Sequence, residues 1–172
     1  MSQDIRFDEG VLHVINQVLT LPQSTTATLL AANMTAFLGA LNVGGNVPAF
    51  NDMRNVTVFA ATNHGFERVG SVIENIPVEG LSRVTSYHMI PGQILYSTDL
   101  QNTTISTLAG ENLTVSVIDG VAFINSARVE STDVLINNGV MHIISEYAAH
   151  QHHSFQANDI QRSQPRQSDS PP

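Results

Sequence analysis

The sequence predicts an α+β domain, because helical patterns dominate the chain up to residue 90 and strand patterns dominate it from residue 94. Between residues 24 and 45, apolar side chains recur every three or four positions, as on the buried face of a helix. From residue 94 onward, segments rich in Val, Ile and Thr alternate with turn residues. The chain has 172 residues, of which 42% are hydrophobic, so it can bury a sizeable core.

The first helix is expected just after Ser24. Thr25 or Thr26 would cap it, because a hydroxyl oxygen accepts hydrogen bonds from the unpaired N–H groups of the first turn. Gly44 and Gly45 would end it, because glycine adopts the left-handed conformation of a helix C-terminus at little cost. The predicted apolar face consists of Leu30, Met34, Phe37, Leu38 and Leu41.

A second helix is expected to begin at His64, with Asn63 as its N-cap. Its apolar stripe would consist of Phe66, Val69, Val72 and Ile73. Residues 81–90 fit either a helix or a strand. Pro91 and Gly92, which follow, predict a turn.

Strands are predicted where β-branched residues cluster between turn residues. The predicted strands are 55–61, with Val56, Val58 and Ala60 on one face, and 94–100, 103–109, 112–118, 121–129 and 139–146. Asp119–Gly120 and Gly110–Glu111 predict tight hairpin turns. The last strand is apolar on both faces, so Val140 and Ile143 are expected to be buried.

Composition excludes several classes of function. The net charge is −8 and the seven basic residues are all Arg, without a basic patch of the kind that nucleic acids or anionic membranes require. The absence of Cys excludes thiol chemistry and the zinc and iron–sulfur sites that depend on thiolates. No apolar run approaches the roughly 18 residues that span a bilayer.

Four N-x-[ST] sequons predict a secreted glycoprotein. They lie at Asn33, Asn55, Asn102 and Asn112. The first residues lack the basic and apolar regions of a signal peptide, which leaves either a cytosolic protein or a mature fragment with an added Met1. The sequons favour the fragment. They also require a host that makes N-glycans, and the Lys-free, Asn- and Thr-rich composition fits a fungal or plant wall.

An internal repeat predicts the domain organisation. Residues 8–17 (DEGVLHVINQ) match residues 137–146 (NNGVMHIISE), and the two glycines lie 129 positions apart. A repeat of this length is a whole domain. We therefore expect residues 1–20 to end a preceding domain, 21–24 to be a linker and 24–149 to form the domain. Residues 150–172 are polar and rich in Ser, Gln and Pro, which predicts a disordered tail.

Four segments resemble the fasciclin (FAS1) family in matching order. Residues 57–66 (TVFAATNHGF) are similar to the family's first box, TVFAPTNxAF, and residues 87–92 (YHMIPG) resemble its YHVVPG segment. Asp99–Leu100 follows at the expected distance, and residues 138–144 (NGVMHII) resemble the second box, NGVIHVID. The chain departs from the pattern at three positions: Ala61 replaces a common Pro, Gly65 a common Ala and Ser145 a usual Asp.

The resemblance implies a fold and a setting. The fold would be a β-sandwich or wedge of about seven strands with helices packed at one end. The setting would be a secreted or cell-surface chain of tandem domains, with a lipid anchor as one option. The tail at 150–172 is like the segment that precedes such an anchor, although the apolar signal of an anchor is missing.

The resemblance also nominates Tyr87 and His88, because the family's YH segment is tied to adhesion. In a strand the two side chains would point to opposite faces. Tyr87 shares a face with apolar Met89, so we expect it inside as a structural residue. His88 is then the candidate for exposure and for adhesion.

The remaining histidines are weaker candidates. His142 and His13 occupy equivalent positions in apolar runs, so each is expected to be a core histidine with a satisfied ring, and no carboxylate has ligand spacing near His142. His150, His152 and His153 could bind a transition metal weakly, but a solvated linker is the favoured interpretation. No catalytic motif, metal site or cofactor site is predicted, and we expect no enzyme.

The sequence therefore predicts an extracellular adhesion, cell-wall or matrix module. Its partners would be a matrix or wall protein or polysaccharide and a neighbouring FAS1 domain, with weak self-association and no nucleic acid. A second hypothesis is a relative that binds or converts a small molecule in a pocket between helices and sheet. A third is a structural spacer.

Overall fold

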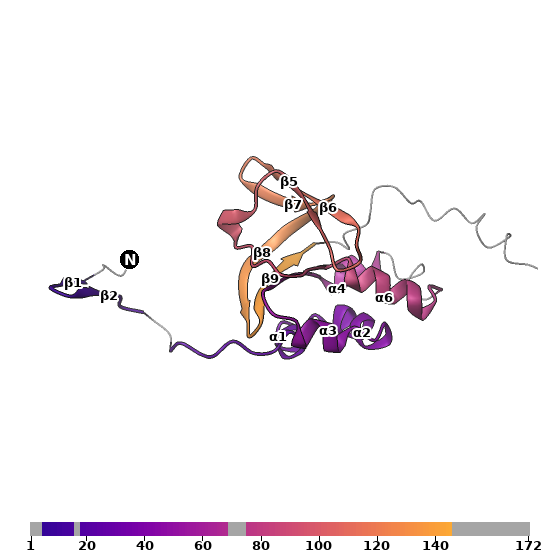
Figure 1. Ribbon diagram of the computed structural model, residues 1–172, viewed down its shortest axis with the longest axis horizontal. Coiled ribbons are helices and arrows are strands. Elements are labelled where there is room, and N and C mark those ends of the chain that lie inside the picture. The colour runs from indigo at the N-terminus through magenta and orange to yellow at the C-terminus, as the bar shows by residue number, and fades with distance from the viewer. Residues whose placement is uncertain (1–4, 16–17, 69–74, 146–172) are drawn as a thin grey trace, which may run out of the picture.

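The computed structural model describes residues 5–15, 18–68 and 75–145. Seven strands form one strongly curved sheet, and Figure 1 shows the helices gathered on one side of it. The strands are β3 (Val56–Ala61), β4 (Met89–Ile90), β5 (Thr103–Ser106), β6 (Asn112–Ile118), β7 (Val121–Ile124), β8 (Ala127–Ile136) and β9 (Gly139–Ile144). The helices are α1 (Thr25–Ala31), α2 (Thr35–Val43), α3 (Val47–Asp52), α4 (Asn63–Glu67) and α6 (Val78–Ser86). The predicted α+β class and seven strands are confirmed.

The strand order in the sheet is β4-β3-β9-β8-β7-β6-β5. Only β3 and β9 run parallel, and the other pairs are antiparallel. Beyond β5, the N–H of Leu108 donates to the carbonyl of Met89 in β4 at 2.8 Å, which brings the two ends of the sheet together. The sheet is therefore nearly a barrel.

The central pair β3–β9 forms the middle of the core. All six residues of β3 are buried, so both of its faces are covered rather than the single face that the alternation of Val56, Val58 and Ala60 suggested. Val140 in β9 is fully buried, as predicted, but Ile143 is only half-buried. Gly139 begins this pair: a Cβ there would lie 1.9 Å from the carbonyl oxygen of Val56, so only glycine fits.

The first predicted helix is two helices. The chain breaks at Asn33, whose φ is +58°, before α2 begins. Leu30 consequently lies on the surface, 62% exposed, instead of on the buried face. Ser24 is the N-cap, since its hydroxyl accepts from the N–H of Ala27 at 3.3 Å. Thr25, a predicted cap, instead donates its hydroxyl to the carbonyl of Phe50.

The predicted N-cap of the second helix was also displaced by one residue. The hydroxyl of Thr62 caps α4 by accepting from the N–H of Gly65 at 3.2 Å. Asn63 instead joins α4 to the preceding helices: its side-chain oxygen accepts from the N–H of Ala36 at 3.0 Å, and its amide donates to the carbonyl of Asn33 at 2.8 Å. Val69, Val72 and Ile73 lie outside the described residues.

Residues 81–90 contain both elements that the sequence left open. Helix α6 runs to Ser86, and β4 follows after a short turn. Gly92 has a φ of +73°, in agreement with the turn expected there.

The predicted strand at 94–100 is wrong. This segment contains a short 3₁₀ helix, η1 (Ser97–Asp99), because side chains rather than a neighbouring strand hold its backbone. The hydroxyl of Thr57 accepts from the N–H of Leu95 at 2.9 Å, and the carboxylate of Asp99 accepts from the N–H of Tyr96 at 3.0 Å.

The second half of the chain otherwise follows its turn residues. Asp119 and Gly120 both have positive φ, as predicted, and join β6 to β7. The predicted strand at 121–129 is divided at Asn125, whose φ is +54°, so that β7 and β8 pair as a hairpin.

The N-terminal segment forms a separate two-stranded hairpin of β1 (Ile5–Phe7) and β2 (Gly10–Leu12). Figure 1 shows it apart from the curved sheet, and every described residue from 5 to 15 is exposed. The predicted tail at 150–172 lies outside the described residues. No described helix combines the length and apolarity needed to cross a membrane.

Candidate functional site

Tyr87 and His88 lie at the end of α6, and both are buried, with exposed fractions of 4% and 0%. The expected exposure of His88 is therefore wrong. Tyr87 has helical dihedral angles (φ −66°, ψ −19°) because it caps α6, so the alternation of a strand does not apply to the pair. The expected burial of Tyr87 is confirmed.

The ring of His88 is held in the core by a hydrogen bond and by aromatic contacts with Phe37 and Tyr87. Its Nδ1 lies 3.0 Å from the carbonyl of Val84, which makes Nδ1 the protonated nitrogen, and its ring lies 5.3 Å from that of Phe37. Burial lowers the pKa of His88 to about 4, against the smaller opposing effect of the Val84 carbonyl. His88 is thus neutral at physiological pH and ties the end of α6 to the core.

Tyr87 joins α6 to the far side of the sheet. Its hydroxyl donates to the carbonyl of Asn112 at 2.9 Å and accepts from the side-chain amide of Asn125 at 3.0 Å. Burial raises the pKa of Tyr87, and the bond from Asn125 opposes this shift. These bonds link α6, β6 and the β7–β8 turn.

His142 is buried in β9 with both ring nitrogens engaged, as expected of a core histidine. Its Nε2 donates to the carbonyl of Leu95 at 2.8 Å, and its Nδ1 lies 3.4 Å from the N–H of Asp133. The ring stacks on Phe59 at 5.6 Å. Burial lowers the pKa of His142, and the Leu95 carbonyl and the charge of Asp133 oppose the shift.

Asp133 is the neighbouring carboxylate that the sequence analysis missed. It accepts from the N–H of Ser97 at 2.8 Å and from the Ser97 hydroxyl, and these bonds are the main cause of its lowered pKa. The signal for this pair was the turn at Asn137–Asn138, since a two-residue hairpin turn pairs Val134 with Met141 and so brings the next residues along, Asp133 and His142, close together at the point where the register shifts. The Ser97 hydroxyl donates to Asp133 rather than to His142. Together with the bond from His142 to Leu95, this contact holds the η1 loop against β8 and β9.

All four sequon asparagines are exposed. The side-chain oxygen of Asn102 accepts from the N–H of Val117 at 2.7 Å, and that of Asn112 accepts from the hydroxyl of Ser106 at 2.8 Å. Asn33 and Asn55 occupy positions of positive φ. Glycosylation at these four residues stays a prediction.

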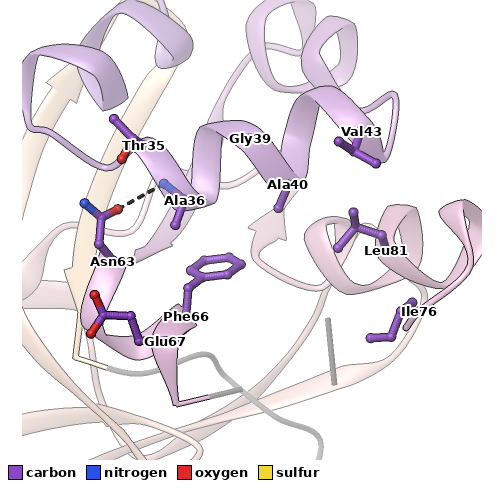
Figure 2. Close-up of a pocket in the computed structure, with 10 residues that line it drawn as sticks. All are labelled: Thr35, Ala36, Gly39, Ala40, Val43, Asn63, Phe66, Glu67, Ile76 and Leu81. Carbon is purple, nitrogen blue, oxygen red and sulfur yellow. Dashed lines mark hydrogen bonds between the residues drawn. The ribbon is translucent and has the colours of Figure 1, made fainter. Parts of the chain in front are cut away.

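A groove of about 750 Å³ lies between α2, α4 and α6. Figure 2 shows Thr35, Asn63 and Glu67 at one end, the Phe66 ring in the middle and apolar side chains at the other end. The apolar end consists of Val43, Ile76 and Leu81. The side-chain amide of Asn63 is hydrogen-bonded to the backbone of Ala36 and Asn33. The other polar side chains that line the groove are those of Glu67 and Thr35.

The other histidine predicted in an apolar run does not join these sites. His13 is exposed in the N-terminal segment, contrary to the buried position expected for it. His150, His152 and His153 lie outside the described residues. Within the described ranges, no three His, Asp or Glu side chains gather as a metal site would require.

Comparison with known proteins assigns the family. The Fasciclin domain profile matches residues 32–148, and the chain therefore belongs to the fasciclin family. It is 50% identical over 139 residues to a "Fasciclin-like arabinogalactan protein" of Arthroderma benhamiae, covering 81% of this chain and 33% of that protein. It is 30% identical over 146 residues to "Fasciclin-like arabinogalactan protein CTB11" of Cercospora beticola, covering 84% of this chain and 39% of that protein.

A solved structure shows the same fold. The FAS1 domain pair from the insect cell adhesion molecule fasciclin I superposes with a TM-score of 0.65 at 17% identity, covering 86% of this chain and 58% of that one.

The chain spans well under half the length of the two fungal relatives, and their size leaves room for further domains.

Proposed function

We propose that the domain is an extracellular adhesion or matrix module that binds a cell-wall or matrix protein or polysaccharide through its surface and performs no chemistry. The observation that carries the proposal is the 50% identity to a fungal fasciclin-like arabinogalactan protein, in a family that includes an insect cell adhesion molecule. The sequons and the acidic, Lys-free composition suit a secreted wall protein.

The buried positions of Tyr87 and His88 change how they would contribute. A fully buried ring cannot touch a partner while the domain stays folded. We therefore assign both residues a supporting role, in which they hold α6 against β3 and β6. Direct contact with the partner then falls to side chains that lie on the surface.

A second candidate function is binding of a small apolar molecule in the groove between α2, α4 and α6. The observation that favours it is the combination of an apolar floor with Thr35 and Glu67 at one end, since small-molecule sites pair apolar walls with a few polar groups. The spacer hypothesis requires no binding surface.

The test is a binding array of wall polysaccharides and matrix proteins probed with the natural, glycosylated, full-length protein and with the same protein after removal of its N-glycans. Binding to one polymer class by both forms supports the module. Binding that disappears with the glycans assigns recognition to the glycans instead. If neither form binds any polymer, the spacer replaces the proposal, unless an apolar probe raises the melting temperature, which would favour the groove.

A further inference from the structure

The N-terminal hairpin repeats the β8–β9 hairpin pair by pair. In the N-terminal hairpin, Ile5 pairs with Leu12, Arg6 with Val11 and Phe7 with Gly10. In the domain, Val134 pairs with Met141, Leu135 with Val140 and Ile136 with Gly139. Every partner in the second set lies 129 positions after its counterpart in the first, which is the spacing of the sequence repeat. The register of the two hairpins is therefore the same.

The N-terminal hairpin has a glycine and apolar side chains of the kind that pack against a neighbouring strand, but no such strand lies beside it within the described residues. Gly139 must be glycine because β3 runs beside β9, with the Val56 carbonyl 1.9 Å from where a Cβ would lie. At Gly10 the nearest atoms to such a Cβ belong to the Phe7 ring of the same hairpin, at 3.2 Å. The glycine and the apolar side chains of this hairpin are thus suited to a third strand that would cover them, as β3 covers β9.

The chain between the two repeats is short. Ile15 corresponds to Ile144, the last residue of β9, and the Gln23 carbonyl is fixed to the domain by the N–H of Asn137 at 2.8 Å. Seven residues lie between Ile15 and Gln23, and the eight Cα-to-Cα steps that join them reach at most about 28 Å in a fully extended chain. Any unit that ends at Ile15 must lie close to the surface around Gln23.

That surface is hollowed. A cavity of about 570 Å³ opens where the linker meets the domain, between Pro22, the end of α3 and the β8–β9 turn. We call it the linker hollow. Its lining includes three apolar side chains that are substantially exposed: Ile94 (37%), Tyr96 (42%) and Leu135 (54%). Asp52, Arg54 and Asn55 supply a polar margin.

The two ends of the domain lie at opposite ends of β9. The chain enters beside Asn137 and Asn138, next to the first residue of β9, and leaves at Ile144, whose carbonyl accepts from the N–H of Thr62. Units joined by a short linker are consequently arranged head to tail. The C-terminal end of one unit faces the linker hollow of the next.

We propose that the linker hollow is the docking surface for a preceding fasciclin unit of the natural chain, whose last two strands are residues 5–15. The inference is independent of the ligand proposed above. It places Ile94, Tyr96 and Leu135 at the interface between the two units. It also assigns Asn55 to that interface, so this sequon carries no glycan in the docked protein, whereas the other three are unaffected.

Hydrogen exchange of the natural full-length protein and of the 172-residue chain tests the proposal directly. In the full-length protein, backbone amides of residues 94–97 and 135–136 should exchange about tenfold or more slowly, because a docked unit covers them. Amides of the β6–β7 turn serve as the control and should exchange equally in both. Equal exchange of the hollow in both proteins, or a glycan found on Asn55 by mass spectrometry, would overturn the proposal.

A matched pair of variants separates docking from folding. Leu135→Asp in the full-length protein should increase the radius of gyration measured by X-ray scattering, because the units separate, whereas Ile118→Asp, at a residue 58% exposed on the β6–β7 hairpin, should leave it unchanged. In the 172-residue chain both variants should keep the parent melting temperature. Scattering profiles that coincide for Leu135→Asp and the parent would contradict docking at this surface.

Discussion

The β1–β2 and β8–β9 hairpins share a sequence pattern and a register, but their second strands differ in burial: β2 is exposed and β9 is mostly buried. Val11 is 46% exposed, whereas its counterpart Val140 is fully buried. His13 is exposed, whereas His142 is buried with both ring nitrogens engaged. Pairing register is therefore a local property of a strand–turn–strand segment, whereas burial depends on β3, which only the second hairpin contacts.

The largest difference is expected at the two glycines. Gly139→Ala should lower the free energy of unfolding by about 4 kcal/mol, because its Cβ would collide with the Val56 carbonyl and force β3 and β9 apart. Gly10→Ala, the matched control, should change it by less than about 0.5 kcal/mol. Urea unfolding of both variants checks this, and equal effects would mean that the strand contact at Gly139 is misplaced.

The next pair compares buried and exposed side chains at the same hairpin position. Met141 is fully buried, so Met141→Ala should cost about 3 kcal/mol through lost burial and the cavity that remains. Leu12 is 51% exposed, and Leu12→Ala should have little effect on the same measurement. A cost below about 1 kcal/mol at Met141 would contradict the packing of β9.

Acid should destabilise the domain through its buried histidines. The unfolded imidazole of His88 binds a proton below its ordinary pKa of 6.5, but the folded one binds it only below about 4, so protons favour the unfolded chain between these values. The free energy of unfolding should therefore be fully retained above pH 6.5 and fall by about 2.5 kcal/mol by pH 4.5. The lowered pKa of His142 acts in the same direction.

Variants identify the source of this pH dependence in urea unfolding at pH 7 and pH 4.5. His88→Gln should weaken the dependence, leaving the part that His142 contributes, whatever the variant does to stability at neutral pH. His13→Gln, in the exposed hairpin, should leave the dependence as it is in the parent. An unchanged slope in His88→Gln would show that other groups take up the protons.

The smallest effect on stability is expected from removing the N-terminal hairpin. Deletion of residues 1–20 should leave the melting temperature nearly unchanged, because the described residues from 5 to 15 are all exposed. It should, however, reduce self-association, since exposed apolar strands with free edges invite pairing between chains. Light scattering that is identical with and without these residues would contradict this.

Features set by neighbouring residues could be predicted from the sequence. Strand β6 begins and ends as predicted, and the Asp119–Gly120 turn has the expected positive φ at both residues, because such elements depend on residue types a few positions apart. The fasciclin boxes also indicated the family, which the profile match confirms. The preceding unit that the repeat indicates stays a prediction.

Only the tertiary structure decided the positions that depend on distant partners. His88 is buried because α6 ends against β3 and Phe37, the η1 loop is held by Thr57 and Asp133, and Asn63 bonds to Ala36 instead of capping its own helix. The linker hollow likewise combines residues from α3, the η1 loop and the β8–β9 turn. Periodicity along the chain carries no information on such contacts, because they join segments that are far apart in sequence and meet only when the sheet curves closed.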